Sequence, residues 1–94
     1  MTLASNHAAT EEDLASRLSK ALSLVTLGAT YAHYRTKTPY KVTHLAILEA
    51  SEEVAVIYEK ASDSSSCIPW VRSLSAFLEK VEFEGSLVDR FQKL

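Results

Sequence analysis

Residues 40–47 read Tyr40-Lys-Val42-Thr43-His44-Leu45-Ala-Ile47, and the apolar side chains change phase halfway along this stretch. Tyr40 and Val42 occupy even positions, whereas Leu45 and Ile47 occupy odd ones. A regular strand cannot bury both sets on one face, because its side chains alternate between faces. We therefore predict a strand over 40–49 with a bend or bulge near Thr43 and His44, as in a long strand shared by two sheets. Such a bent strand is typical of a small barrel.

Other short segments with strand character surround this stretch. The expected strands are 30–35, 54–58, 68–72, 81–83 and 87–91, with turns at Thr36 to Pro39, Ala50 to Glu53 and Glu84-Gly85. Residues 74–78 pack their apolar side chains as a single helical turn does. The sequence thus predicts a mainly β domain over 29–94, a small SH3-like or Sm-like antiparallel barrel. The rival ferredoxin-like α+β fold needs a second long helix after Leu48, where the residues favour strand.

The N-terminal part has helical periodicity instead. Residues 1–9 are expected to be flexible, and an amphipathic helix is expected over 10–28. Thr10 followed by Glu11, Glu12 and Asp13 resembles a capped helix start, and Gly28 offers a stop. One stripe of this helix is apolar: Leu14, Leu18, Ala21, Leu22 and Val25. We expect the stripe to pack on the barrel of its own chain or on a second copy, as a homodimer, and the sequence leaves both open.

Composition excludes several function classes. The chain has 94 residues, 47% hydrophobic and 23% charged, with a net charge of −2, which fits one globular domain. It shows neither a targeting signal nor an apolar run long enough to span a membrane, so we expect a cytoplasmic protein without a membrane partner. Cys67 is the only cysteine, and His33, His44 and Glu49 lack metal-ligand spacing. No metal and no cofactor are expected.

A family resemblance covers nearly all of the chain after Gly28. It rests on these residues in succession: Tyr31-Ala-His33-Tyr34-Arg35, Tyr40-Lys-Val42, Val56-Ile-Tyr58, Trp70-Val71-Arg72-Ser-Leu74, Phe77-Leu78, Val81, Gly85 and Arg90-Phe91. Together they resemble family 1653 of the domains of unknown function. The resemblance implies a short, mostly bacterial protein with an SH3-like or Sm-like barrel, and it brings no established activity. The chain departs from the family pattern by its N-terminal helix, the serine loop before Trp70, and Thr36 and Ser73, where glycine and proline are common.

A candidate ligand surface follows from the predicted barrel. Tyr31, His33 and Arg35 share one face of the first strand. Three further residues lie near them if the barrel closes as predicted: Tyr40, Trp70 and Arg72. Aromatic faces and guanidinium groups suit planar or anionic ligands, although aromatic residues on small barrels are more often core packing. We therefore predict a non-enzymatic binding module whose small-molecule or protein partner is unknown.

Two alternatives stay open. Tyr34 to Lys41 forms a basic and aromatic edge, because no acid occurs between Asp13 and Glu49, and such an edge can bind RNA or single-stranded DNA. A small enzyme that uses His33 or Cys67 is the second alternative. The serine-rich stretch Ser62 to Ser66 is expected to be a mobile loop.

Overall fold

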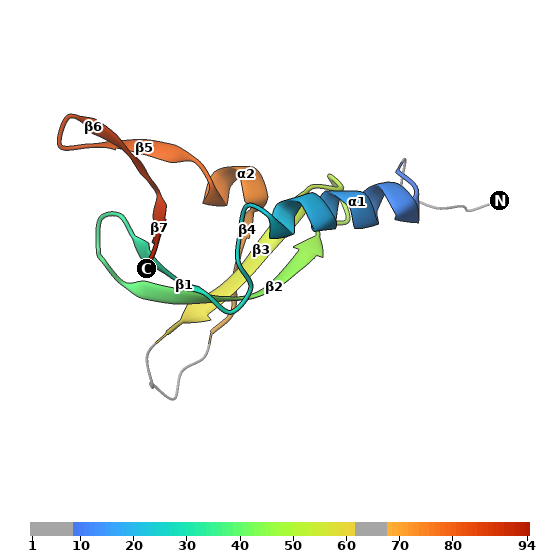
Figure 1. The fold of residues 1–94 in the computed structure, drawn as a ribbon, viewed down its shortest axis with the longest axis horizontal. Helices are drawn as coiled ribbons and strands as arrows, with labels where there is room; N and C mark the ends of the chain where they lie inside the picture. The colour runs from blue at the N-terminus through green and yellow to red at the C-terminus, as the bar shows by residue number, and fades with distance from the viewer. Residues whose placement is uncertain (1–8, 62–67) are drawn as a thin grey trace.

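The computed structural model describes residues 9–61 and 68–94, and the expected mobile loop at Ser62 to Ser66, like almost all of the expected flexible N-terminus, lies outside them. The described elements, in chain order, are α1 (Glu11–Leu22), β1 (Thr30–His33), β2 (Pro39–Ile47), β3 (Val54–Lys60), β4 (Trp70–Ser73), α2 (Leu74–Phe77), β5 (Lys80–Phe83), β6 (Ser86–Asp89) and β7 (Phe91–Lys93). Figure 1 shows α1 and α2 beside a strongly curved sheet, with the β5–β6 hairpin projecting away from it. The mainly β fold with an N-terminal helix is confirmed.

Five strands form one antiparallel sheet in the order β4-β3-β2-β1-β7, and β5 and β6 form a separate pair. The prediction of a closed barrel is wrong, because β4 and β7 remain the two edges of the larger sheet. β4 has only four residues, since Ser73 caps α2 directly after it by accepting a hydrogen bond from Ala76 N–H at 3.2 Å. At the other end, Arg90 interrupts the expected strand 87–91, and its N–H donates to the carbonyl of Glu79. The chain therefore splits into β6 and β7 instead of closing the sheet.

The predicted bulge in β2 is confirmed. Val42 lies opposite Tyr58 and His44 lies opposite Ile57, so Thr43 is the extra residue between them. The Thr43 hydroxyl donates to the carbonyl of Ile57 at 3.2 Å. This single insertion returns the apolar residues to one side, because Leu45 then lies opposite Val56, two residues from Tyr58 and on the same face.

α1 begins as predicted and ends earlier than predicted. Thr10 forms a capping box with Asp13, in which its side chain accepts from the Asp13 N–H at 3.1 Å. The helix ends at Leu22, and the expectation of a helix to Gly28 is wrong. Val25 N–H still bonds to the carbonyl of Ala21, but Gly28 N–H donates to the carbonyl of Val42 on β2. Gly28 thus fixes the entry into the sheet with a positive φ of 82°. No helix among the described residues is long and apolar enough to cross a membrane.

The core lies on one face of the curved sheet, which we call the inner face. Its buried members are Val25, Tyr31, Val42, Val56, Tyr58, Phe77 and Phe91. Phe77 is the one buried residue of α2, and its ring stacks on that of Phe91 with 4.4 Å between centroids. Val25, from the segment after α1, joins the same cluster. The segment that follows α1 therefore packs on the sheet of its own chain.

Candidate ligand-binding site

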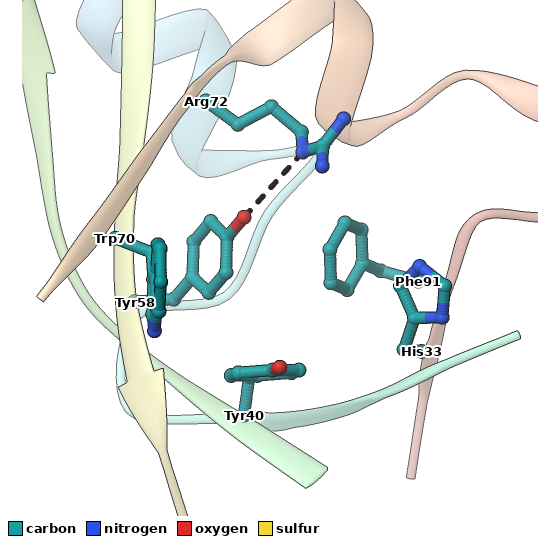
Figure 2. Close-up of a pocket in the computed structure, with 6 residues that line it drawn as sticks. All are labelled: His33, Tyr40, Tyr58, Trp70, Arg72 and Phe91. Atoms are coloured by element: carbon teal, nitrogen blue, oxygen red, sulfur yellow. Dashed lines mark hydrogen bonds between the residues drawn. The ribbon is translucent and has the colours of Figure 1, made fainter. Parts of the chain in front are cut away.

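A hollow opens on the inner face where the two edges of the sheet curve toward each other. Its volume is about 210 Å³. Six residues line it, from β1, β2, β3, β4 and β7 (Figure 2): His33, Tyr40, Tyr58, Trp70, Arg72 and Phe91. The strand register explains this convergence, because Trp70 lies opposite Tyr58 and His33 lies opposite Phe91, and directly opposed residues share a face.

Tyr58 and Phe91 form the floor of the hollow. Each side chain is about 6% exposed, and their ring centroids lie 5.3 Å apart in an edge contact. Phe77 lies below both rings, stacked on Phe91 and tilted against Tyr58 at 5.6 Å. The floor is therefore part of the hydrophobic core and is held rigidly by it.

Tyr40 and Trp70 form the walls. The Tyr40 ring meets Tyr58 edge-on at 5.3 Å, with an interplanar angle of 85°. Trp70 is 50% exposed and stands beside Tyr58 on the edge strand β4 (Figure 2). Half of the largest aromatic side chain in the protein thus faces solvent at the mouth of the hollow.

Arg72 lies above the floor. Its Nε donates a hydrogen bond to the Tyr58 hydroxyl at 3.4 Å, drawn as the dashed line in Figure 2, and its guanidinium carbon lies 5.6 Å from the Phe91 ring centroid. Within residues 9–61 and 68–94, no carboxylate pairs with this side chain. Its two terminal nitrogens keep their hydrogen-bond donors available.

His33 completes the lining. Its Nδ1 accepts a hydrogen bond from the Arg35 backbone N–H at 3.2 Å, which leaves Nε2 as the protonated nitrogen of a neutral ring. Burial lowers the pKa of His33 below its ordinary value of 6.5, and the positive charges of Arg90, Arg72 and Arg35 lower it further. His33 is therefore neutral at pH 7 and offers one donor.

The family model described as "Protein of unknown function (DUF1653)" matches residues 29–93. The chain belongs to DUF1653. No curated protein and no solved structure matches it. The DUF1653 region begins just after Gly28 and holds all six residues of the hollow, whereas α1 lies outside it.

Four of the six predicted site residues lie together in the hollow of the DUF1653 region: His33, Tyr40, Trp70 and Arg72. Tyr31 shares their face but is buried, and its hydroxyl accepts from the Thr26 N–H at 3.0 Å. The placement of Arg35 on the strand face is wrong, because β1 ends at His33 and Arg35 is exposed in the following turn. Its guanidinium carbon lies 5.8 Å from the ring centroid of Tyr34. The turn starts early because Lys37 adopts a positive φ and its N–H bonds back to His33.

Sequence reasoning missed Tyr58 and Phe91. Tyr58 ends an apolar run, which indicates that its side chain is buried. The run does not indicate that the ring forms the floor of a hollow. Phe91 reaches the hollow because β7 pairs with β1, a contact between residues almost sixty positions apart. Phe91 stands out in the sequence as an aromatic residue next to Arg90. The sequence does not show that its strand pairs with β1.

The structure also shows the surroundings of the two alternative sites, the basic edge and the enzyme residues. On the basic edge, Lys37 Nζ lies 5.9 Å from the ring centroid of Phe83, and Lys41 is exposed on β2. For the enzyme alternative, Cys67 lies outside the described residues. The one hydrogen bond that the His33 side chain makes with a described residue is accepted from the backbone N–H of Arg35. No group of three metal-ligating side chains occurs in the described part of the chain.

Proposed function

We propose that this DUF1653 chain is a non-enzymatic binding module that takes a small ligand with a flat ring into the hollow. The observation that carries this proposal is an open hollow with a rigid aromatic floor and a half-exposed tryptophan beside it. A volume of about 210 Å³ is below the roughly 300–1,000 Å³ of sites for drug-sized molecules, which favours a ligand whose flat part consists of one or two rings.

The physical reason for a ring lies in the walls. Aromatic side chains attract flat ligands through stacked and edge contacts, each contributing about 0.5–1.5 kcal/mol beyond the buried area. Figure 2 shows the Tyr40 ring lying flat, with one face turned toward Tyr58 and Phe91 and so toward the hollow. Trp70 and Tyr40 then contact a ring from two sides.

Native mass spectrometry of gently purified protein tests the proposal. We expect a retained small molecule on the unmodified protein and its loss from Trp70→Ala. Val71→Ala is the matched control, because Val71 is also on β4, is 60% exposed, and lies opposite Ile57 on the other face of the sheet. Absence of any bound mass, together with no ligand in a screen of ring compounds, would contradict the proposal.

Nucleic-acid binding along Tyr34 to Lys41 is the second candidate. One observation favours it: Arg35, Lys37 and Lys41 form no ion pair with any described acid. Their charges are therefore available to phosphates.

The remaining proposals concern fold and assembly. We propose that the bulged five-stranded sheet is an open relative of SH3-like or Sm-like barrels. Homodimerisation through α1 is also proposed, since Leu22 and Leu27 are 50% and 46% exposed and line an apolar hollow with Leu18. The mass measured for the assembly in the same native experiment tests the dimer.

A further inference from the structure

The polar atoms around the aromatic hollow have no partners among the described residues. They are the Tyr40 hydroxyl, the Trp70 indole N–H, the terminal nitrogens of Arg72 and Nε2 of His33. The tryptophan, arginine and neutral histidine groups all donate, and the tyrosine hydroxyl both donates and accepts. A ligand that satisfies this set must supply acceptors, such as ring nitrogens, carbonyl oxygens or anionic oxygens.

The charge of the hollow points in the same direction. None of the six lining residues is an acid, and three arginines act on His33: Arg35, Arg72 and Arg90. Of these three arginines, only Arg90 forms an ion pair with an acid among the described residues, with Glu79 at 2.6 Å. An aromatic cage with this surplus of positive charge disfavours a cationic ligand and favours an anion.

Resting on the proposed function, we infer that the ligand is a heteroaromatic ring that carries a phosphate, as in a nucleoside monophosphate. The ring lies between Trp70 and Tyr40, whose N–H and hydroxyl meet the acceptors on its edge. The phosphate binds the free terminal nitrogens of Arg72, with His33 as a further donor. An aromatic carboxylate matches the charge but leaves the edge donors of the walls unpaired, which costs free energy.

Calorimetric titration tests the inference, with the fluorescence of Trp70, the single tryptophan, as a second signal. The probes are adenosine and uridine monophosphates, the two nucleosides, benzoate and inorganic phosphate. We expect at least one monophosphate to bind, and its nucleoside to bind about tenfold more weakly or worse, because the charge-assisted contacts are lost. Benzoate and phosphate alone should be weaker still.

Two arginine variants locate the phosphate. Arg72→Gln should remove the difference between nucleotide and nucleoside, and Arg72→Lys should restore part of it. Arg17→Gln, the same change on α1, is the control, because Arg17 donates to the carbonyl of Glu52 and lies outside the hollow. Thermal unfolding verifies that each variant is folded.

The outcomes separate this inference from the proposed function. If nucleosides or benzoate bind as tightly as the monophosphates, or if Arg72→Gln leaves the difference intact, the nucleotide inference is overturned while a ring-binding module survives. If no probe binds and native mass spectrometry finds no ligand, both are overturned.

Discussion

Replacing Phe77 with alanine tests whether the core supports the hollow as described. Phe77 is 1% exposed, and its ring stacks on Phe91 with an interplanar angle of 5°. It also meets the ring of Tyr31 edge-on at 5.4 Å. Since Phe91 is half of the floor, the change removes the layer directly beneath the hollow.

The magnitude follows from the burial and from the neighbours. Truncating a buried phenylalanine to alanine costs about 3–5 kcal/mol, and the cost is highest where the surroundings cannot collapse. Tyr31, Tyr58 and Phe91 belong to three strands of one hydrogen-bonded sheet, so they cannot move far into the space. We therefore expect a loss of about 4 kcal/mol, out of a total stability of about 5–15 kcal/mol for a domain of this kind.

Urea unfolding followed by Trp70 fluorescence and circular dichroism measures this loss. With a slope of about 2 kcal/mol per molar urea, the midpoint should fall by about 2 M. Leu87→Ala is the control, because Leu87 is 71% exposed on β6 and its loss should change stability by less than about 0.5 kcal/mol. A loss below about 1 kcal/mol for Phe77→Ala would refute the packing described.

Three further predictions concern the bulge, the pH dependence and the basic edge. Deleting Thr43 should leave a regular ladder with Val42 and Leu45 on their present face, so the protein should fold and lose about 1 kcal/mol in urea unfolding for the hydrogen bond to Ile57; failure to fold would contradict this. Burial lowers the pKa of His33, and the charges of Arg90, Arg72 and Arg35 lower it further, so stability should fall as the pH drops from 6.5 toward the lowered value. In melting temperatures measured over a series of pH values, His33→Gln should remove the decrease below pH 6.5. An unchanged profile would count against this prediction. If the edge from Tyr34 to Lys41 binds single strands, fluorescence titration with short oligonucleotides should show affinity that falls steeply with salt; no binding at low salt would end that proposal.

The sequence predicts the local features of this fold and not the long-range ones. The capping box at Thr10, the bulge at Thr43 and the turn at Glu84-Gly85 follow from neighbouring residues, and all three are present. Glu84 and Gly85 both have positive φ, as the tight hairpin requires. The end of α1 was mispredicted because Val25 continues the apolar stripe although it packs in the sheet core. Periodicity cannot distinguish these two ways of burying a side chain.

The candidate site also has local features that the sequence predicts and long-range features that it does not. Trp70 and Arg72 are two apart on one strand, so their shared face could be predicted from the chain alone. Phe91 and Tyr58 could not, because their positions depend on which strands pair. Whether Tyr31 is exposed or buried could not be predicted from the sequence, because its depth is set by α2 and by the segment after α1.

The open sheet and the hollow have the same physical cause. In a closed barrel the edge strands pair, and the side chains between them fill the interior. Here β4 and β7 stay unpaired on their outer sides while the sheet curves enough to bring Arg72 of one edge over Phe91 of the other. The gap between the edges is lined by inner-face side chains that a closed barrel would bury, including Trp70 at 50% exposure. The two edges of the sheet thus supply opposite sides of one hollow. Only one of them can be altered without the core, because β7 carries the core residue Phe91, whereas Trp70 on β4 is half exposed. If the hollow is the proposed site, a change that shortens β4 should therefore abolish ligand binding before it unfolds the core.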